Sequence, residues 1–449
     1  MRDIVISVVV FGLLASLFKH PVIGAHLWAW LSLMNPHKLA WGFARGLPFA
    51  QATAGLTMLV LLQTKHKQRL PWNGVTTIWA LLFLWMTVTC FFAYNQPQLV
   101  LDRWVFVLKI HLMLLVSLML VVEPRHFKIL VYVVTLSVAF FGIKGGVYTI
   151  STGGGGRVWG PPGGLLQGNN EMAIGLVMVL PFMYWMRETL AHRWLRRGLG
   201  LGMLLCVVSI LGTQSRGALL AVIAMGFFLG VKSKHPLRVT LALAVVLLVT
   251  AAFMADEWVE RMETIQTYQE DSSAMSRIWT WTTLWNAALN NPLTGAGFRA
   301  DSRLVFSLYA PQGDQWEMFT GRIYVAHSIY FQMLGEHGFV GLFLFLGLWA
   351  TVWAQAGRIG KQAAKVAELS AWLPLLMRMV QASLVGYAVG GAFLSLAYLD
   401  LTFYLMGFVI LGGITLSRAL TRQPAAPQVA GSTAAKVSQA LPASRARGA

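Results

Sequence analysis

Long apolar runs separated by short polar segments extend along almost the whole chain. Most of them reach or approach the ~20 residues that a helix needs to cross ~30 Å of hydrocarbon. Lys19-His20-Pro21 interrupts the first region, and because proline kinks or breaks a helix, residues 4–34 count as one broken element. The pattern predicts an all-α polytopic membrane protein with about twelve transmembrane helices. The apolar runs are 4–18, 22–34, 48–63, 76–93, 104–122, 127–148, 171–186, 199–212, 218–231, 237–254, 338–354, 375–397 and 403–416.

The composition agrees with this class, because 57% of the 449 residues are hydrophobic and only 12% are charged. No short apolar stretch ends at a small-residue cleavage site, so no cleavable signal peptide is expected. Cys90 and Cys206 both lie inside apolar runs, which indicates ordinary packed residues rather than metal ligands or a disulfide.

The formal net charge of +18 follows the loops and does not indicate a nucleic-acid partner. Lysine and arginine concentrate in every second loop and in the tail after Ser417, whereas the intervening loops hold few. By the positive-inside rule, the basic loops and the C-terminus face the cytoplasm. The longest of the other loops, 255–325, faces outward and is rich in acidic residues.

These features divide the chain into four parts. They are transmembrane helices in 1–254, an outer insertion in 255–325, further transmembrane helices in 326–419 and a disordered cytoplasmic tail in 420–449. Within the insertion, "MSRIWTWTTLWNAALNNP" has apolar residues at helical spacing and ends at Asn290-Asn291-Pro292. Its tryptophans suit a helix in the outer bilayer interface, and a helix packed on the transmembrane bundle fits the pattern equally well.

Four arginines fall near the ends of apolar segments on the outer side: Arg157, Arg216, Arg277 and Arg299. Arginine suits phosphate because it stays charged and offers a planar fork of donors, and the glycines around Arg157 would let backbone N–H groups approach an anion. The alternative for each is a surface ion pair or a lipid-headgroup contact, which the pattern favours for Arg277, Arg303 and Arg322. A turn of a few residues fixes Arg216 at the mouth of the bundle, which favours phosphate binding there.

Two histidines occur in "AHSIYFQMLGEHGFVG", at the start of a late apolar segment. Ten helical residues span ~15 Å, so if His327 lies at the outer boundary, His337 lies near mid-membrane on another face. A base for a water-borne acceptor should be His327, because neutral imidazole near pH 7 suits proton abstraction from a hydroxyl. His337 is expected to be an interhelical packing residue. Gly335, Gly338 and Gly341 recur every third residue, which favours close packing of another helix.

Motifs for metal or nucleotide binding are absent from the sequence. There is no Asp-x-Asp pair, Walker loop, His-Glu-x-x-His motif or cysteine cluster. Arginines stand where many phosphate-handling enzymes use a metal, so neither a metal nor another cofactor is expected.

Three stretches resemble the bacterial O-antigen ligase family, within the superfamily that also holds O-antigen polymerases and protein O-oligosaccharyltransferases. His327-Ser328, nine further residues and then "GFVG" resemble the family signature. "SRGALLA" resembles the Arg-Gly turn of the superfamily, and "SRIWTWTTLWNAALNNPLTGAGF" resembles the stretch before the histidine motif. "NPHKLAWGFARGLPFA" and "RVWGPPGG" resemble a subgroup of O-glycosylation ligases found near exosortase systems. Ser328 departs from the superfamily, where Asn is common.

The resemblance implies a GT-C-like transferase of the bacterial inner membrane with its active site facing the periplasm. Such enzymes transfer a glycan from undecaprenyl diphosphate without metal or nucleotide, and in the ligases the acceptor is a sugar hydroxyl of lipid A–core. Carried over to this chain, the motif histidine is His327, the turn arginine is Arg216, and Arg299 is a looser match. The expected partners are the lipid-linked donor, lipid A–core and membrane lipids, and a monomer is the simplest expectation.

The sequence therefore predicts inverting, metal-independent transfer at the outer mouth of the bundle. His327 would act as base, and Arg216 would hold the diphosphate with Arg157, Arg299 and Arg277. A polymerase or a protein O-oligosaccharyltransferase with the same donor remains an alternative. A transporter is a further one, for which Lys109, His111, Lys144 and Arg378 would be the polar residues within the membrane.

Overall fold

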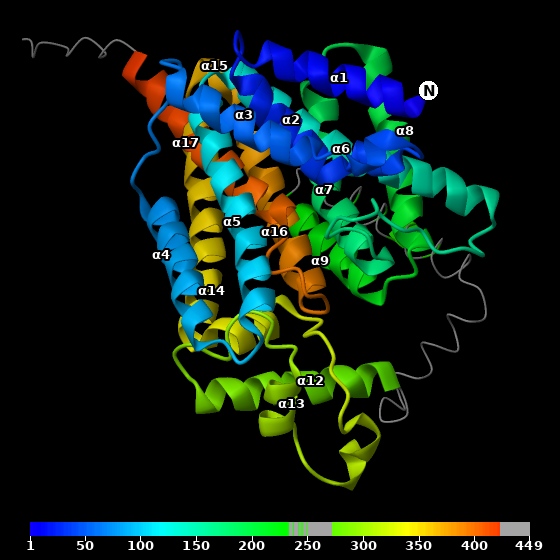
Figure 1. Cartoon of the computed structure of the whole chain (residues 1–449). Coiled ribbons are helices and arrows are strands. Elements are labelled where there is room, and N and C mark those ends of the chain that lie inside the picture. Colours follow the sequence, from blue (N-terminus) through cyan, green and yellow to red (C-terminus); the bar gives the residue numbers. More distant parts are fainter. Residues whose placement is uncertain (233–236, 238–240, 242–243, 246–247, 249–271, 423–449) are drawn as a thin grey trace, which may run out of the picture.

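The computed structural model describes residues 1–232 and 272–422, together with 237, 241, 244, 245 and 248. All the elements in the described residues are helical (Figure 1). The α-helices are α1 (Arg2–Ser16), α2 (Val22–Met34), α3 (Phe49–Gln63), α4 (Gly74–Val88), α5 (Pro97–Leu120), α6 (Pro124–Ser151), α7 (Asn169–Thr189), α8 (Arg193–Gly212), α9 (Arg216–Lys232), α12 (Ser272–Asn290), α13 (Arg303–Tyr309), α14 (Ile329–Ala363), α15 (Ala367–Ser370), α16 (Leu373–Gly391) and α17 (Asp400–Arg422). Short 3₁₀ helices are η1 (Pro36–Leu39), η2 (Phe43–Gly46), η3 (Thr89–Phe92) and η4 (Asp314–Phe319).

Seven helices in the described part of the chain are long and apolar enough to cross a membrane. They are α4 with its η3 extension, α5, α6, α8, α14, α16 and α17. The apolar helices α2 and α3 are shorter, and 13 to 15 residues of helix reach only about 20–22 Å. The structure thus supports an all-α, multi-pass membrane protein. The count of about twelve remains a prediction, and the predicted crossing at 237–254 and the tail beyond residue 422 lie outside the described residues.

The predicted break near Lys19 is confirmed. Helix α1 ends at Ser16 and α2 begins at Val22, directly after Pro21. Both helices lie with α3 at the end of the bundle opposite α12 (Figure 1).

Helix α7 forms the centre of the bundle, packed against α6, α8, α9 and α16. Its residues are buried on all sides from Met172 to Pro181, which explains why the run is apolar throughout rather than on one stripe. Polar contacts fix its neighbour, because the Ser383 hydroxyl of α16 donates to the Met178 carbonyl at 2.8 Å and Trp185 Nε1 donates to the Trp372 carbonyl at 2.9 Å.

Helix α12 lies across one end of the bundle (Figure 1) and ends at Asn290, as the sequence predicted. It packs against α13 and α14, with Trp279 buried among aromatic rings of the insertion. Trp281 stacks on Phe331 of α14, and its Nε1 donates to the Ala326 carbonyl at 2.7 Å. Trp285 remains 44% exposed. The helix is therefore packed on the bundle, as one of the two sequence interpretations predicted, and its location in the outer bilayer interface remains a prediction.

The glycines of α14 contact the end of α12 and the turn after it. A Cβ on Gly335 would lie 2.5 Å from the Leu284 side chain, and one on Gly338 would lie 2.3 Å from the Leu293 carbonyl oxygen. Gly338 also has φ +67°, so α14 is kinked there rather than continuous. The close approach predicted from the glycine spacing is present, and its partners are a crosswise helix and a turn.

Replacing Gly338 by alanine should therefore destabilise the fold. A positive φ in a residue with a Cβ costs about 1–3 kcal/mol, and the clash with Leu293 adds to this. Thermal unfolding of the purified protein in detergent should show a lower Tm for Gly338→Ala. The matched control is Gly347→Ala in the same helix, where a Cβ meets nothing within 4 Å. An unchanged Tm for Gly338→Ala would contradict the kinked geometry.

Candidate active site at the α12 end of the bundle

The segment 392–399, which joins α16 to α17, is the point around which the candidate residues gather. Three hydrogen bonds attach it to the beginning of α14: Ser395 to His327, Ala397 to Gln332, and Tyr398 to Glu336. A fourth, from the Tyr387 hydroxyl to the Leu396 carbonyl at 3.0 Å, attaches it to α16. These bonds hold the start of α14 and the segment as one unit.

His327 lies just outside α14 rather than in its first turn. Ser328 is the N-cap of the helix, and His327 precedes it with φ +44°, a conformation that few residues other than glycine adopt. The Ser395 hydroxyl accepts the His327 backbone N–H at 2.8 Å and so supports this conformation. Among the described residues, no hydrogen bond to its half-buried imidazole is found. An imidazole in this position is available to a substrate.

The surroundings of His327 keep its imidazole neutral. Burial lowers the pKa of His327 below its ordinary value, and the positive charge of Arg277 on α12 lowers it further. Both effects disfavour imidazolium. Neutral imidazole is the form that can accept a proton, so the site favours a base.

The pH dependence of activity should respond to Arg277. With His327 as the predicted base, which must be neutral to accept a proton, activity should be present above the pKa of His327 and should be lost as the pH falls through it. Removing the Arg277 charge raises this pKa, so Arg277→Gln should lose activity at a higher pH than the parent protein. Transfer rates between about pH 5 and 8 would show this, with exposed Arg322→Gln as control. If Arg277→Gln and Arg322→Gln lose activity at the same pH, Arg277 does not influence the pKa of a catalytic His327.

Arg216 and Arg157 belong to two loops that pack together. Arg216 is the partly buried first residue of α9, after a turn in which Gln214 has φ +55°. The exposed Arg157 donates from Nε to Gln214 Oε1 at 3.1 Å. A Cβ on Gly217 would lie 3.4 Å from Phe393, which places the arginine turn against the segment 392–399.

Arg299 is held mainly through its backbone. It has φ +62°, its N–H donates to Glu336 Oε1 at 3.2 Å, and its carbonyl accepts from Asn95 Nδ2 at 2.8 Å. Its guanidinium forms an ion pair with Asp301 at 3.1 Å and stays 43% exposed. A phosphate approaching Arg299 would compete with Asp301 for the same group.

His337 is a packing residue, as the sequence predicted, but the expected position near mid-membrane is wrong. The kink of α14 at Gly338 follows His337 directly, so His337 lies at the α12 end of the bundle, against Thr89 at the end of α4 and the turn after α12. Its side chain is fully buried, with Nδ1 2.7 Å from Thr89 Oγ1 and Nε2 2.7 Å from the Tyr398 hydroxyl. The Tyr398 hydroxyl also donates to Glu336, so one tyrosine joins the neighbouring ionisable residues of α14. Burial and the Glu336 carboxylate raise the pKa of Tyr398 well above its ordinary value, which keeps it a donor.

The sequence interpretation missed Arg103, Tyr398 and Thr89. The Arg103 guanidinium lies 5.0 Å from the centre of the Tyr398 ring, and its charge acts on Asp301, the partner of Arg299. The available signal for Arg103 was its isolation as the only basic residue of the outer loop 94–103. Nothing in the sequence alone pairs Tyr398 or Thr89 with His337, because the residues lie far apart along the chain.

The described contacts therefore join the predicted residues as three groups around one segment. Arg277 acts on His327, Arg157 bonds to the turn that carries Arg216, and Arg299 bonds to Glu336. No three His, Cys, Asp or Glu side chains in the described ranges come together as metal ligands would, and metal independence of the reaction remains a prediction.

Two family models match the chain. Residues 201–346 match the O-antigen ligase family, and residues 1–190 match a family of unknown function. A comparison with curated proteins finds no match. The first match includes Arg216, Arg277, Arg299 and His327, whereas Arg157 falls in the second. The association with exosortase systems remains a prediction. Residues 201–346, about a third of the chain, are thus similar to the O-antigen ligase family, and together with the seven candidate transmembrane helices of the described residues this similarity supports a multi-pass membrane protein with a transferase activity.

Proposed function

We propose that the chain is an O-antigen ligase, which transfers a glycan from undecaprenyl diphosphate to a sugar hydroxyl of lipid A–core and so forms lipopolysaccharide. The main support for this proposal is that residues within the family match also lie close together in the structure. The residues matched to the O-antigen ligase family include His327 and Arg216. His327 bonds to Ser395 of the segment 392–399, and Gly217, which follows Arg216, lies against Phe393 of the same segment.

In the proposed reaction, His327 takes the proton of the acceptor hydroxyl as its oxygen attacks the anomeric carbon of the donor. The bond between that carbon and the diphosphate oxygen breaks, and the electron pair leaves with the diphosphate. Attack opposite the leaving group inverts the anomeric configuration. Fixed positive charge stabilises the leaving diphosphate, so no general acid is needed.

The diphosphate is assigned to Arg216, with Arg157, Arg299 and Arg277 as further contacts. Arg216 suits this role because it is partly buried on a short turn, where a guanidinium loses little freedom when it binds an anion. Arg157 is coupled to the same turn through Gln214. Arg299 would exchange its ion pair with Asp301 for a phosphate oxygen, and Arg277 also tunes His327.

The proposed orientation places this end of the bundle in the periplasm, with the protein in the inner membrane. Support comes from charge, because the opposite end carries α15 with its flanking lysines and the C-terminal end of α17 (Figure 1). By the positive-inside rule those basic segments face the cytoplasm.

The experiment that tests the acceptor uses purified protein with a radiolabelled undecaprenyl-diphosphate glycan and lipid A–core, and separates the products on a gel. The proposal predicts labelled lipid A–core. Label that stays on a lengthening carrier-linked glycan would instead show a polymerase. Label that reaches only an added acceptor protein would show a protein O-oligosaccharyltransferase.

A further inference from the structure

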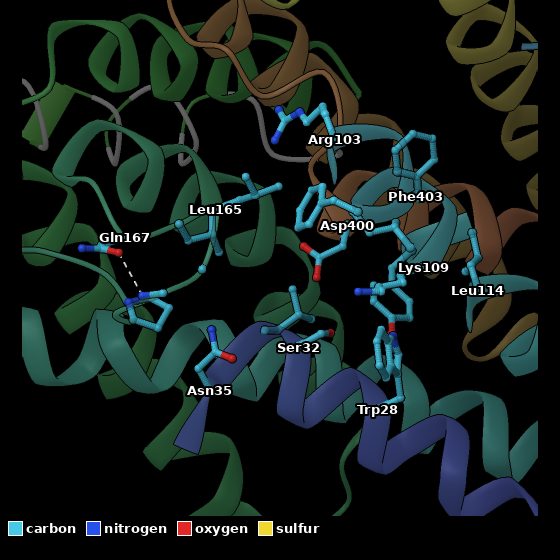
Figure 2. Close-up of a pocket in the computed structure, with 18 residues that line it drawn as sticks. Trp28, Ser32, Asn35, Arg103, Lys109, Leu114, Leu165, Gln167, Asp400 and Phe403 are labelled. Atoms are coloured by element: carbon cyan, nitrogen blue, oxygen red, sulfur yellow. Dashed lines mark hydrogen bonds between the residues drawn. The ribbon is translucent and has the colours of Figure 1, made fainter. Parts of the chain in front are cut away.

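A pocket of about 450 Å³ lies between α2, α5, α17 and the segment 161–167 before α7 (Figure 2), and it adjoins the candidate site through Arg103, which lies over Tyr398. Neither His327 nor any of the four arginines assigned to the diphosphate lines it. Its polar lining consists mainly of Arg103, Lys109, Asp400, Ser32, Asn35 and Gln167.

Charged groups face this pocket without neutralising one another. The Lys109 ammonium and the Asp400 carboxylate both point into the central space, with Arg103 at its edge (Figure 2). Among the described residues, no ion pair within 4 Å joins Lys109 to Asp400. The charge of Arg103 also acts on Asp301 and Glu336 outside the pocket, so Lys109 is the cation that faces Asp400 across the central space. Ionisable side chains among the helices of a membrane protein are rare, which makes a pocket lined by Lys109 and Asp400 a candidate ligand site.

Two buried polar atoms at the pocket lack a well-formed hydrogen bond among the described residues. The Tyr404 side chain is 3% exposed, and its hydroxyl lies near Ser32 and Asp400 without such a bond. Arg103 Nε is likewise buried without one. Buried polar groups are nearly always hydrogen-bonded, so orphaned donors that line a cavity indicate an occupant with acceptor oxygens.

The remaining lining is apolar and follows the pocket inward along α5. Phe106, Ile110 and Leu114 continue the face that begins at Arg103, over about 16 Å of helix. Phe403 of α17 and Trp28 of α2 complete this wall. A ligand that satisfies both regions has an anionic head and a hydrocarbon chain.

We propose that this pocket binds a phosphorylated amphiphile, with phosphate oxygens on Arg103 and Lys109 and the chain along Ile110 and Leu114. Arginine and lysine are the side chains that bind phosphate, and hydrogen bonds between charged partners are stronger than those between neutral ones. The negative charge of Asp400 repels the phosphate, and its carboxylate can accept a hydrogen bond from a hydroxyl of the ligand. The ligand chemistry has two sources, a prenyl phosphate or a membrane phospholipid, and binding does not require the chain to be a ligase.

The test measures binding of undecaprenyl phosphate and of phosphatidylglycerol to the full chain by native mass spectrometry. Lys109→Gln should weaken binding by about tenfold or more, because a charge-assisted contact is lost. Asp400→Asn should strengthen it, because the amide removes repulsion and can still accept the Leu401 N–H that Asp400 accepts at 2.9 Å. The control is Lys144→Gln on α6, an exposed lysine outside the pocket lining.

Each outcome decides the proposal. Selective loss of undecaprenyl phosphate binding in Lys109→Gln would assign the pocket to a prenyl phosphate, and equal loss of both ligands would assign it to phospholipids. Undecaprenol bound as tightly as undecaprenyl phosphate would overturn the proposal, since no phosphate would be recognised. Weaker binding by Asp400→Asn would also overturn it and would indicate a neutral hydroxylated ligand. An unchanged Tm must accompany either variant for its result to count.

Discussion

Glycan transfer is expected to fall by about 10²–10⁴-fold when His327 is replaced by alanine, the range that positioned base catalysis typically supplies. The acceptor hydroxyl then has no group to take its proton as it attacks. Folding should be unaffected, because the contact that fixes this residue uses its backbone N–H, which alanine keeps. Single-turnover transfer by purified protein at saturating donor measures the loss.

His337 provides the matched comparison, ten residues along the chain in the same signature. His337→Ala leaves Thr89 and Tyr398 without a buried partner, so its main effect should be a lower Tm. The account therefore predicts a loss of rate at normal stability for His327→Ala and a loss of stability for His337→Ala. Normal transfer by His327→Ala would remove His327 as the base.

Replacing Arg216 by alanine should lower the transfer rate by about 10²–10³-fold, as for removal of one preorganised charge contact to a developing anion. Arg216→Lys should recover part of the rate, because lysine supplies the charge without the bidentate fork. The control is Arg322→Ala, since Arg322 is an exposed arginine of the outer insertion. The same transfer assay, repeated over a range of donor concentrations, separates weaker binding from slower chemistry.

Equal losses for Arg216→Ala and Arg322→Ala would contradict a specific diphosphate contact. They would indicate instead that the outer positive charge attracts the donor as a whole. Added salt distinguishes the two cases further, because long-range attraction between exposed charges is screened at high ionic strength, whereas a partly buried contact is screened much less.

Local features of the sequence predicted several parts of this fold. Proline and its polar neighbours located the break after α1, and the Asn-Asn-Pro sequence located the end of α12. The assignment of His337 to packing also followed from local pattern, whereas its expected depth near mid-membrane was wrong, because α14 is kinked at Gly338 rather than continuous. Each of these depends on residues that are close together in the chain.

Features that depend on distant residues were not predicted. The bond from Tyr398 to Glu336 joins residues 62 positions apart, and Arg103 meets Tyr398 only through the fold. The conformation of His327 depends on Ser395 of another segment. Apolar composition alone also cannot distinguish membrane-spanning helices from shorter packed ones. Helices α2 and α3 are apolar like the seven candidate spans and differ from them in length.

The most direct test of the central claim measures release of undecaprenyl diphosphate during transfer by the purified protein, with EDTA present. We predict that one carrier molecule is released for each glycan that reaches lipid A–core, and that the folded His327→Ala protein releases none. Donor that remains intact with the folded parent protein, or release that continues unchanged without His327, would contradict it.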